Sequence, residues 1–301
     1  MKTMKNILLV GAGAIGMLHA VKLFRLPGVD FRLAVDRERK SRYRSDGRFF
    51  NGERFDFPLY YPAEDEGFAP DLVIFATKSW QLIEAAKMVE KSLAPETIIL
   101  PLLNGISATE RLKNIFPDNR VLYGYFIGHA SVRKNHRITH DGVGADHLGY
   151  RDNREIAPEV AAIAELWQDA GIDCVIEPDM DKAIWKKYIL NVGVNQSTAY
   201  FEVNYGDLRK NPEKLAFAEK LMREALSVAQ KLGIDLDDSA VTNAMDVILS
   251  MPKDAETSMY QDVKNSRPTE VDIFAGTLCK MAAKLSLTLP ANQEVLAHFS
   301  K

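Results

Sequence analysis

The chain has 301 residues, of which 47% are hydrophobic and 26% are charged, and its formal net charge is −3. This length predicts two domains, because a single hydrophobic core rarely serves so many residues. The mildly acidic balance argues against a nucleic-acid-binding protein, and no apolar run is long enough to span a membrane. The two cysteines, Cys174 and Cys279, lie far apart and argue against a disulfide framework or a cysteine-built metal site, which fits a reducing cytoplasm.

A predicted strand, a glycine-rich turn and a predicted helix open the chain. Residues 6–10 form an apolar run typical of a buried strand, residues 17–24 have the pattern of an amphipathic helix, and between them stand Gly11, Ala12, Gly13, Ala14, Ile15 and Gly16. In such a motif the first glycine allows a tight turn, the second lets a pyrophosphate approach the backbone, and the third lets helix and strand pack closely. Because the N-terminus of the helix then faces the anion, this context predicts a dinucleotide-binding site.

The residues after the second predicted strand, 31–35, give conflicting indications of which dinucleotide binds. Asp36 lies 20 residues after Gly16 (36 − 16), where an acidic side chain normally accepts hydrogen bonds from the ribose hydroxyls of NAD. Arg37 follows directly, and an arginine here is the usual partner of the 2′-phosphate of NADP. Further basic residues come next, and they read equally well as a solvated loop: Arg39, Lys40, Arg42 and Arg44.

Two further apolar runs, 71–76 and 97–100, predict parallel strands on either side of a helix over 81–93. Thr77-Lys78 follows the first run, and Asn104-Gly105 comes shortly after the second. The carboxyl ends of parallel strands share one edge of the sheet, where open α/β sheets bind ligands. We therefore expect Lys78 and Asn104 to face a ligand, although Lys78 also suits a helix start and Asn-Gly suits a turn.

The first domain is expected to end near Pro178. Short alternating pieces with several glycines predict antiparallel strands between 120 and 153, followed by a helix over 157–170 and a last strand over 173–176. Four histidines fall in that antiparallel stretch without the spacing of a metal site: His129, His136, His140 and His147. These patterns predict a Rossmann-type α/β domain over residues 1–178 and an all-helical domain over residues 179–301.

Helical periodicity dominates the second half, with helices expected over 181–200, 211–232, 238–250, 256–264, 268–285 and 291–299. Lys187, Asn191 and Asn195 are spaced by four residues, so on a helix they share one face at intervals of roughly 6 Å. Three polar groups on an apolar helix indicate a substrate site, the alternative being that solvent or backbone satisfies each. Pro268 suits a first turn, which places Glu270 in that turn as a helix-dipole charge, and Ser258 reads as a helix cap.

Taken in order, these motifs resemble those of the 2-dehydropantoate 2-reductase (ketopantoate reductase) family over essentially the whole chain. The resemblance rests on the glycine motif, Lys78, Asn104, the Lys187-Asn191-Asn195 series, and two C-terminal motifs that contain Ser258 and Glu270. It implies a Rossmann domain, a helical domain and an active site in the cleft between them. The implied reaction is NADPH-dependent reduction of 2-dehydropantoate to pantoate, in pantothenate biosynthesis.

The same resemblance implies a role for each site residue. Lys187 would be the general acid, Glu270 would complete the catalytic site, and three residues would bind the substrate: Asn191, Asn195 and Ser258. The cofactor side would be lined by Lys78, Asn104 and Ala130. Chemistry supports these roles, because a ketone that accepts hydride gains negative charge that an ammonium group stabilises and protonates, and a nearby carboxylate keeps that lysine charged.

Two residues depart from the family pattern. Asp36 stands where the family commonly has an arginine, and Tyr205 stands where an asparagine that contacts substrate is often found. Both departures favour an alternative enzyme, an NAD-linked dehydrogenase of another 2-hydroxy or imino acid. A second alternative is a non-catalytic regulatory protein that binds the cofactor. A small 2-oxo acid is the expected partner, without nucleic acid or membrane, and a homodimer is an open alternative to a monomer.

Overall fold

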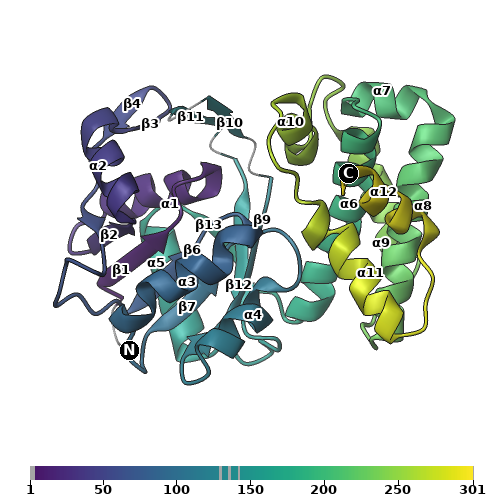
Figure 1. The fold of residues 1–301 in the computed structure, drawn as a ribbon. Coiled ribbons are helices and arrows are strands. Elements are labelled where there is room, and N and C mark those ends of the chain that lie inside the picture. The colour runs from purple at the N-terminus through teal and green to yellow at the C-terminus, as the bar shows by residue number, and fades with distance from the viewer. Residues whose placement is uncertain (1–3, 129–130, 135–136, 142, 301) are drawn as a thin grey trace. The chain divides into compact units, whose positions relative to one another are not determined.

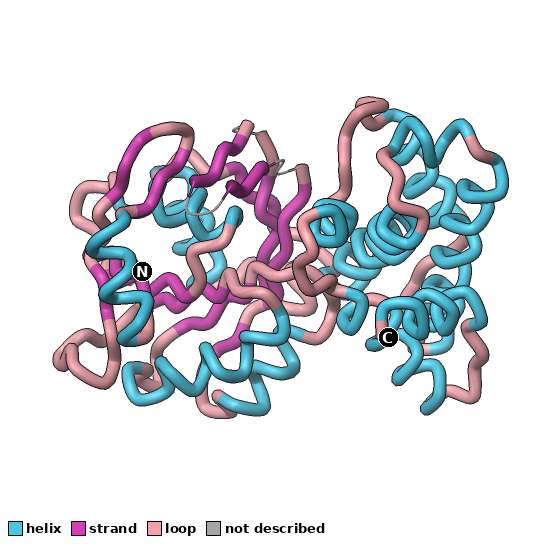
Figure 2. Tube along the Cα trace, turned by 45° about the horizontal axis from the view of Figure 1, so that its top comes forward, coloured by secondary structure: helices cyan, strands magenta, loops and turns pink. Residues whose placement is uncertain are grey.

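The computed structural model describes residues 4–128, 131–134, 137–141 and 143–300 (Figure 1). The chain divides into two compact units, Met1–Met180 and Asp181–Lys301. The first unit combines helices with sheets, and between residues 181 and 300 the second unit has helices and loops without a strand (Figure 2). The expected fold class, a parallel-sheet Rossmann-type domain followed by a helical domain, is therefore confirmed.

A six-stranded parallel sheet forms the centre of the first unit, in the order β5-β2-β1-β6-β7-β8. Its strands are β1 (Asn6–Val10), β2 (Asp30–Ala34), β5 (Leu59–Tyr60), β6 (Leu72–Phe75), β7 (Ile98–Pro101) and β8 (Arg120–Val121). The central strand β1 pairs with a neighbour on each side, and Ile7 lies opposite both Phe31 and Leu72. Since β1 is covered on both faces, it reads as an uninterrupted apolar run.

Four helices cover the two faces of this sheet: α1 (Ala14–Phe24), α3 (Leu82–Val89), α4 (Ala108–Ile115) and α5 (Pro158–Asp169). Helix α2 (Arg37–Asp46) follows β2, and the short 3-10 turns η1 (Ser79–Gln81) and η2 (Glu90–Ser92) flank α3. Ile7 and Leu9 of β1 belong to a core with residues of α1 and α5. Leu8 and Val10 point to the other face and pack with residues of α3 and α4. This alternation builds two cores, one on each side of β1.

Two smaller sheets complete the first unit. One has the order β10-β11-β3-β4, and the other has the order β13-β12-β9. Their strands are β3 (Arg48–Phe50), β4 (Glu53–Phe55), β9 (Tyr123–Ile127), β10 (Ser131–Lys134), β11 (Arg137–His140), β12 (Ala145–Gly149) and β13 (Asp173–Val175). The pairs β10–β11 and β9–β12 are antiparallel, as the glycine-rich pattern predicts, whereas β3 and β4 carry no pattern that the sequence reveals.

A buried polar cluster joins α1 to β12 and α5. His19 Nε2 lies 2.5 Å from Asp146 Oδ2, and the indole Nε1 of Trp167 donates to the same oxygen at 2.7 Å. His19 Nδ1 lies 2.8 Å from the carbonyl oxygen of Ile15, so this nitrogen must carry a proton to donate. A second proton is then needed between His19 Nε2 and Asp146, because an unprotonated nitrogen facing a carboxylate would repel it.

The second unit contains α6 (Met180–Tyr200), α7 (Tyr205–Lys210), α8 (Pro212–Lys231), α9 (Ser239–Ser250), α10 (Ser258–Lys264), the 3-10 turn η3 (Val271–Ile273), α11 (Ala275–Lys284) and α12 (Pro290–Phe299). Helices α6 and α8 approach closely at Gly193, where a Cβ would come within 2.4 Å of two Met222 side-chain carbons. Of the helices that the structure describes, none is long and apolar enough to cross a membrane.

The expectation of one helix over residues 268–285 is wrong. Glu270 precedes the 3-10 turn η3, and α11 begins only at Ala275. The cause is hydrogen bonding to α6: the Tyr188 hydroxyl donates to the carbonyl oxygens of Ile273 (2.8 Å) and Phe274 (2.9 Å), and Gln196 Oε1 accepts from the Ala275 N–H (2.9 Å). The Ala275 N–H that donates to Gln196 cannot donate to the Val271 carbonyl, the bond that would continue an α-helix through this segment.

The interpretation of the basic run after Asp36 as a solvated loop is also wrong, because residues 37–46 form helix α2. Asp36 begins this helix, and its carboxylate accepts a hydrogen bond from the Arg39 N–H at 2.7 Å. An acidic N-cap stabilises a helix start both by this bond and by its charge. Glu38 and Arg42 add an ion pair one turn apart, at 3.3 Å.

Candidate functional site

Two of the three motif glycines are required by the packing of the chain itself. Gly11 has a φ of +108°, and a Cβ there would lie 2.6 Å from the carbonyl oxygen of Ala76. A Cβ at Gly16 would lie 1.9 Å from the carbonyl oxygen of Gly11. Neither contact is tolerable, so these glycines let the turn fold tightly against β6 and against itself.

Gly13 is different, because nothing in the described structure requires a glycine there. Its φ is −76° and its ψ is −166°, a conformation that any residue adopts. A Cβ at this position would meet only the carbonyl oxygen of Ala76, at an ordinary 3.9 Å. Gly13 also begins α1 without a side-chain cap. Gly13 therefore leaves open the space beside the helix N-terminus, whose free N–H groups suit an anion, so the turn has room for a dinucleotide pyrophosphate.

The side chain of Asp36 is engaged within α2. One carboxylate oxygen accepts from the Arg39 N–H, and the other pairs with Arg39 Nη1 at 2.5 Å. Arg37, with 79% of its side chain exposed, pairs with Glu64 at 3.0 Å. The hydrogen bond from Arg37 and the nearby Lys40 lower the pKa of Glu64. The end of β2 therefore presents an acidic residue whose charge is partly offset and an arginine that remains accessible.

Lys78 and Asn104 lie beyond the carboxyl ends of β6 and β7, which are neighbours in the sheet. Lys78 precedes the 3-10 turn η1, and its ammonium nitrogen lies 5.7 Å from the centre of the Trp80 ring. Asn104 precedes Gly105, whose φ is +90°. Both residues thus share the sheet edge with the glycine-rich turn, as expected. Ala130, the remaining candidate on the cofactor side, lies outside the described residues.

In the second unit, Lys187, Asn191 and Asn195 all lie on α6, where their spacing places them along one face. Lys187 and Asn191 are partly exposed, whereas Asn195 is 7% exposed. Thr198 continues the same stripe three residues after Asn195. Its hydroxyl lies 2.7 Å from the hydroxyl of Thr257.

The contact between Thr198 and Thr257 locates Ser258 near this stripe. Thr257, which directly precedes α10, caps that helix by accepting from the Tyr260 N–H at 3.2 Å. The interpretation of Ser258 as the cap is therefore wrong: Ser258 is the first helical residue, and it is exposed. Because the hydroxyls of Thr198 and Thr257 are in contact, the start of α10 is held at the end of the Lys187-Asn191-Asn195 face.

Glu270 is buried, at 5% exposure, at the start of η3. The expectation of a helix-dipole charge in an α-helical first turn is wrong, because α11 begins five residues later. Tyr188, the neighbour of Lys187 on α6, binds the Ile273 and Phe274 carbonyls and so ties the η3 segment to that helix. The second unit thus joins three segments that carry predicted site residues: α6, the start of α10, and η3.

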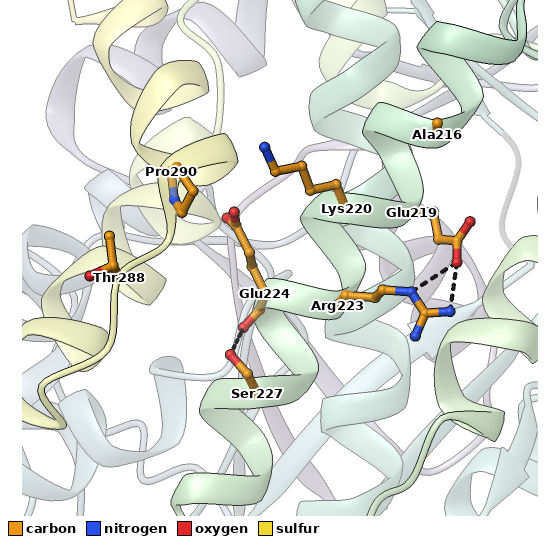
Figure 3. A pocket seen from close by; sticks show the side chains of 8 residues that line it. All are labelled: Ala216, Glu219, Lys220, Arg223, Glu224, Ser227, Thr288 and Pro290. Atoms are coloured by element: carbon orange, nitrogen blue, oxygen red, sulfur yellow. Dashed lines mark hydrogen bonds and ion pairs between the residues drawn. The ribbon is translucent and has the colours of Figure 1, made fainter.

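A separate hollow of about 500 Å³ lies along α8 (Figure 3), and none of the predicted site residues lines it. Three of its charged side chains have partners within the fold: Arg223 pairs with Glu219 at 2.6 Å, and the Glu224 carboxylate accepts from the N–H groups of Ala291 and Asn292 at 2.9 Å. These contacts explain the charges of those three residues as structural. Among the described residues, no group of three or more histidine, cysteine, aspartate or glutamate side chains is arranged to hold a metal ion.

One residue near the glycine-rich turn has no signal in the sequence. Arg48 donates from Nη2 to the carbonyl oxygen of Ala12 at 2.7 Å, although 36 residues separate them. It belongs to no recognised motif and begins a strand that the sequence pattern does not predict. Only the fold of α2 and β3 brings it to the turn.

Comparison with known proteins identifies the family. The pattern of ketopantoate reductase PanE/ApbA matches residues 7–153, and the pattern of the ketopantoate reductase PanE/ApbA C terminal matches residues 179–301. A 2-dehydropantoate 2-reductase from Aquifex aeolicus is 30% identical over 298 residues, which are 96% of this chain and 94% of the relative.

Solved structures agree in fold. A dimeric ketopantoate reductase from Staphylococcus aureus superposes with a TM-score of 0.82 at 23% identity, covering 98% of this chain and 97% of the other. A D-mandelate dehydrogenase with NADH and anilino(oxo)acetate superposes with a TM-score of 0.85 at 22% identity, covering 96% of each chain. Both family patterns and a relative matched over nearly its full length point the same way: this chain belongs to the ketopantoate reductase family of oxidoreductases.

Proposed function

We propose that this protein reduces 2-dehydropantoate to pantoate with NADPH. The observation that carries the proposal is the polar face of α6, where Lys187, Asn191 and Asn195 lead to Thr198 and, through its contact with Thr257, to Ser258. A cation, two carboxamides and a hydroxyl suit a small 2-oxo acid, whose carboxylate and ketone need hydrogen-bond donors. The Aquifex aeolicus relative, which carries the name of this activity, supports the choice of substrate.

In the proposed mechanism, a bound reduced nicotinamide supplies a hydride to the ketone carbon of the substrate. Lys187 stabilises the negative charge that develops on the ketone oxygen and donates the proton that completes the hydroxyl group. Asn191, Asn195 and Ser258 orient the substrate by hydrogen bonds that add no opposing charge. Glu270 favours the protonated form of Lys187. Lys78 and Asn104, at the sheet edge, would contact the cofactor beside the glycine-rich turn.

An assay of reductase activity tests this proposal. Purified protein is mixed with NADPH or NADH and each of a panel of 2-oxo acids, and cofactor oxidation is followed by absorbance. We expect the highest kcat/KM with 2-dehydropantoate and NADPH. Absence of oxidation with every 2-oxo acid would contradict the proposed activity.

A second candidate is an NADH-linked dehydrogenase of another 2-hydroxy acid. Asp36 favours it, since a carboxylate at this position normally binds the ribose hydroxyls of NAD. Tyr205 also favours it, because this residue stands where the family often has an asparagine. Tyr205 is 8% exposed, and its burial raises its pKa to about 12. In the same assay, a preference for NADH together with the 2-oxo acid corresponding to mandelate would favour this candidate.

The preference for NADPH depends on Arg37. We expect Arg37→Ala to raise KM for NADPH much more than KM for NADH, because only NADPH has the 2′-phosphate that an arginine grips. The pairing of the Asp36 carboxylate with Arg39 reduces the electrostatic repulsion between Asp36 and this phosphate. Arg42→Ala, at an exposed position of the same helix, serves as the control. Equal effects of Arg37→Ala on both cofactors would rule out the assignment.

We also propose that the protein acts in the cytoplasm as a homodimer. Both cysteines, Cys174 and Cys279, are free thiols, which suits a reducing compartment. The Staphylococcus aureus structure is of a dimeric ketopantoate reductase, which supports the dimer. Light scattering after size-exclusion chromatography distinguishes the dimer from a monomer of 33.7 kDa.

A further inference from the structure

Arg48 makes a contact with the glycine-rich turn that none of the roles above uses. It is the first residue of β3, it is 5% exposed, and its Nη2 donates to the Ala12 carbonyl oxygen at 2.7 Å. Its guanidinium also lies over the ring of Tyr43, 4.7 Å from the ring centre. An arginine is rarely buried to this extent unless its charge has specific partners, so the contact with the turn is a built feature of the fold.

The path of the chain between α2 and β3 explains how Arg48 reaches the turn. Helix α2 ends at Gly47, whose φ of +66° lies in the left-handed region that favours glycine. A Cβ at Gly47 would lie 2.7 Å from Arg54 Nε, so a larger residue would also have to displace this half-exposed side chain. After this glycine the chain enters β3, which belongs to the sheet β10-β11-β3-β4 (Figure 1). Strand β3 packs against α1, the helix that follows the glycine-rich turn.

The geometry of the peptide bond gives the contact its consequence. The carbonyl of Ala12 and the N–H of Gly13 belong to the same planar trans peptide, so they point in opposite directions. A side chain that holds the Ala12 carbonyl therefore also fixes the direction of the Gly13 N–H. The positive charge of Arg48 polarises this peptide and makes the Gly13 N–H a stronger donor.

We propose that Arg48 is a positioning residue for cofactor binding: it holds the glycine-rich turn so that the Gly13 N–H faces the cofactor pyrophosphate. This inference rests on the proposed function, because it needs a dinucleotide bound at the turn. Arg48 acts through the peptide between Ala12 and Gly13, unlike Arg37, which is proposed to contact the 2′-phosphate directly. NADPH and NADH both contain the pyrophosphate, so Arg48 serves both equally.

Binding measurements with Arg48→Met test the inference against the matched control Arg42→Met. Arg42 lies on α2, its guanidinium is 5.7 Å from the centre of the same Tyr43 ring, and its removal changes the net charge equally. We expect Arg48→Met to weaken the binding of NADPH and of NADH by the same factor, on the order of 10-fold. This is the scale of one charge-assisted hydrogen bond. The affinity for AMP, which lacks a pyrophosphate, and kcat at saturating cofactor should change little, and Arg42→Met should bind both cofactors like the wild type.

A second measurement needs no cofactor. In the free protein, the backbone amide resonance of Gly13 should shift in Arg48→Met and remain in place in Arg42→Met. Arg48→Lys keeps the charge without the planar fork, so we expect it to restore only part of the affinity. Should Arg48→Met fail to fold by circular dichroism, Arg48→Lys is judged by the same criteria.

The outcomes separate the two proposals. Unchanged cofactor affinity and an unmoved Gly13 resonance in the Arg48 variant would overturn the positioning role while leaving the proposed function intact. A loss confined to NADPH would also overturn it, because it would assign Arg48 to the 2′-phosphate. A wild-type protein that binds neither cofactor would overturn the proposed function itself.

Discussion

Lys187 is the residue whose replacement separates chemistry from folding most directly. It is partly exposed on α6, so its removal leaves no large cavity in the core. We expect Lys187→Ala to lower kcat by about 10²-fold, the usual scale for losing a general acid, with little change in KM for the cofactor. Lys186→Ala, an exposed neighbour on the same helix, is the control. Steady-state kinetics decide, and normal turnover in Lys187→Ala would remove this lysine from the mechanism.

His19 makes the stability of the protein depend on pH. Burial lowers the pKa of His19, but the charge and hydrogen bond of Asp146, with the bond to the Ile15 carbonyl, outweigh burial, so the pKa is raised above its usual 6.5. Because the folded state holds the proton of His19 more tightly than the unfolded state does, protonated His19 stabilises the fold. This stabilisation is fully present below pH 6.5, and it is lost as the pH rises through the pKa of His19 in the folded state.

We therefore expect the urea midpoint of the wild type to fall as the pH is raised above about 6.5, the unperturbed value for histidine. Asp146→Asn removes the charge that raises the pKa of His19, and its amide oxygen can still accept the hydrogen bond from the Trp167 indole. The urea midpoint of this variant should therefore depend much less on pH over the same range. Parallel pH profiles for the two proteins would mean that His19 does not titrate as described.

At the scale of elements, the start of α10 connects folding to the site. Thr257 caps this helix and contacts Thr198 on α6, so its hydroxyl both stabilises the helix and fixes the position of Ser258. We expect Thr257→Val to cost about 1 kcal/mol of unfolding free energy, the usual value for a lost cap, and to raise KM for the 2-oxo acid more than KM for the cofactor. Urea unfolding and steady-state kinetics measure the two effects.

Thr257→Ser keeps the hydroxyl and should retain both properties. Thr242→Val removes a hydroxyl from an exposed position on α9 and serves as the control for a general effect of such a change. Loss of stability with an unchanged KM in Thr257→Val would show that the cap does not position Ser258.

Elements differ in how well the sequence predicts them. The strand over residues 6–10 is predicted with its observed bounds, because an apolar run of this length that ends at a glycine is too short for a typical helix. The break between η3 and α11 has no local signal, since Tyr188 and Gln196 act on it from 79 or more residues away. Helix α2 is hidden by its composition, which lacks an apolar face, and Asp36 is the only indication of its start.

For the whole molecule, the class of fold follows from the order of its patterns. Alternating strands and helices predict a parallel sheet, and a long helical stretch after the last strand predicts a second unit of another kind. That Lys187, Asn191 and Asn195 lie along one helix face was predictable, because four-residue spacing is a local property. The contacts of Arg48 with Ala12 and of Thr198 with Thr257 were not, since they depend on how distant elements pack.

The three glycines of the turn also differ in what they preserve. Gly11 and Gly16 are demanded by the backbone, so a descendant of this chain that no longer bound a dinucleotide would still have to keep both in order to fold. The fold does not require a glycine at position 13, so neutral mutation could replace Gly13 in a descendant that no longer bound a dinucleotide. In a comparison of distant descendants, the middle glycine would therefore be the position that records whether a lineage still uses its cofactor.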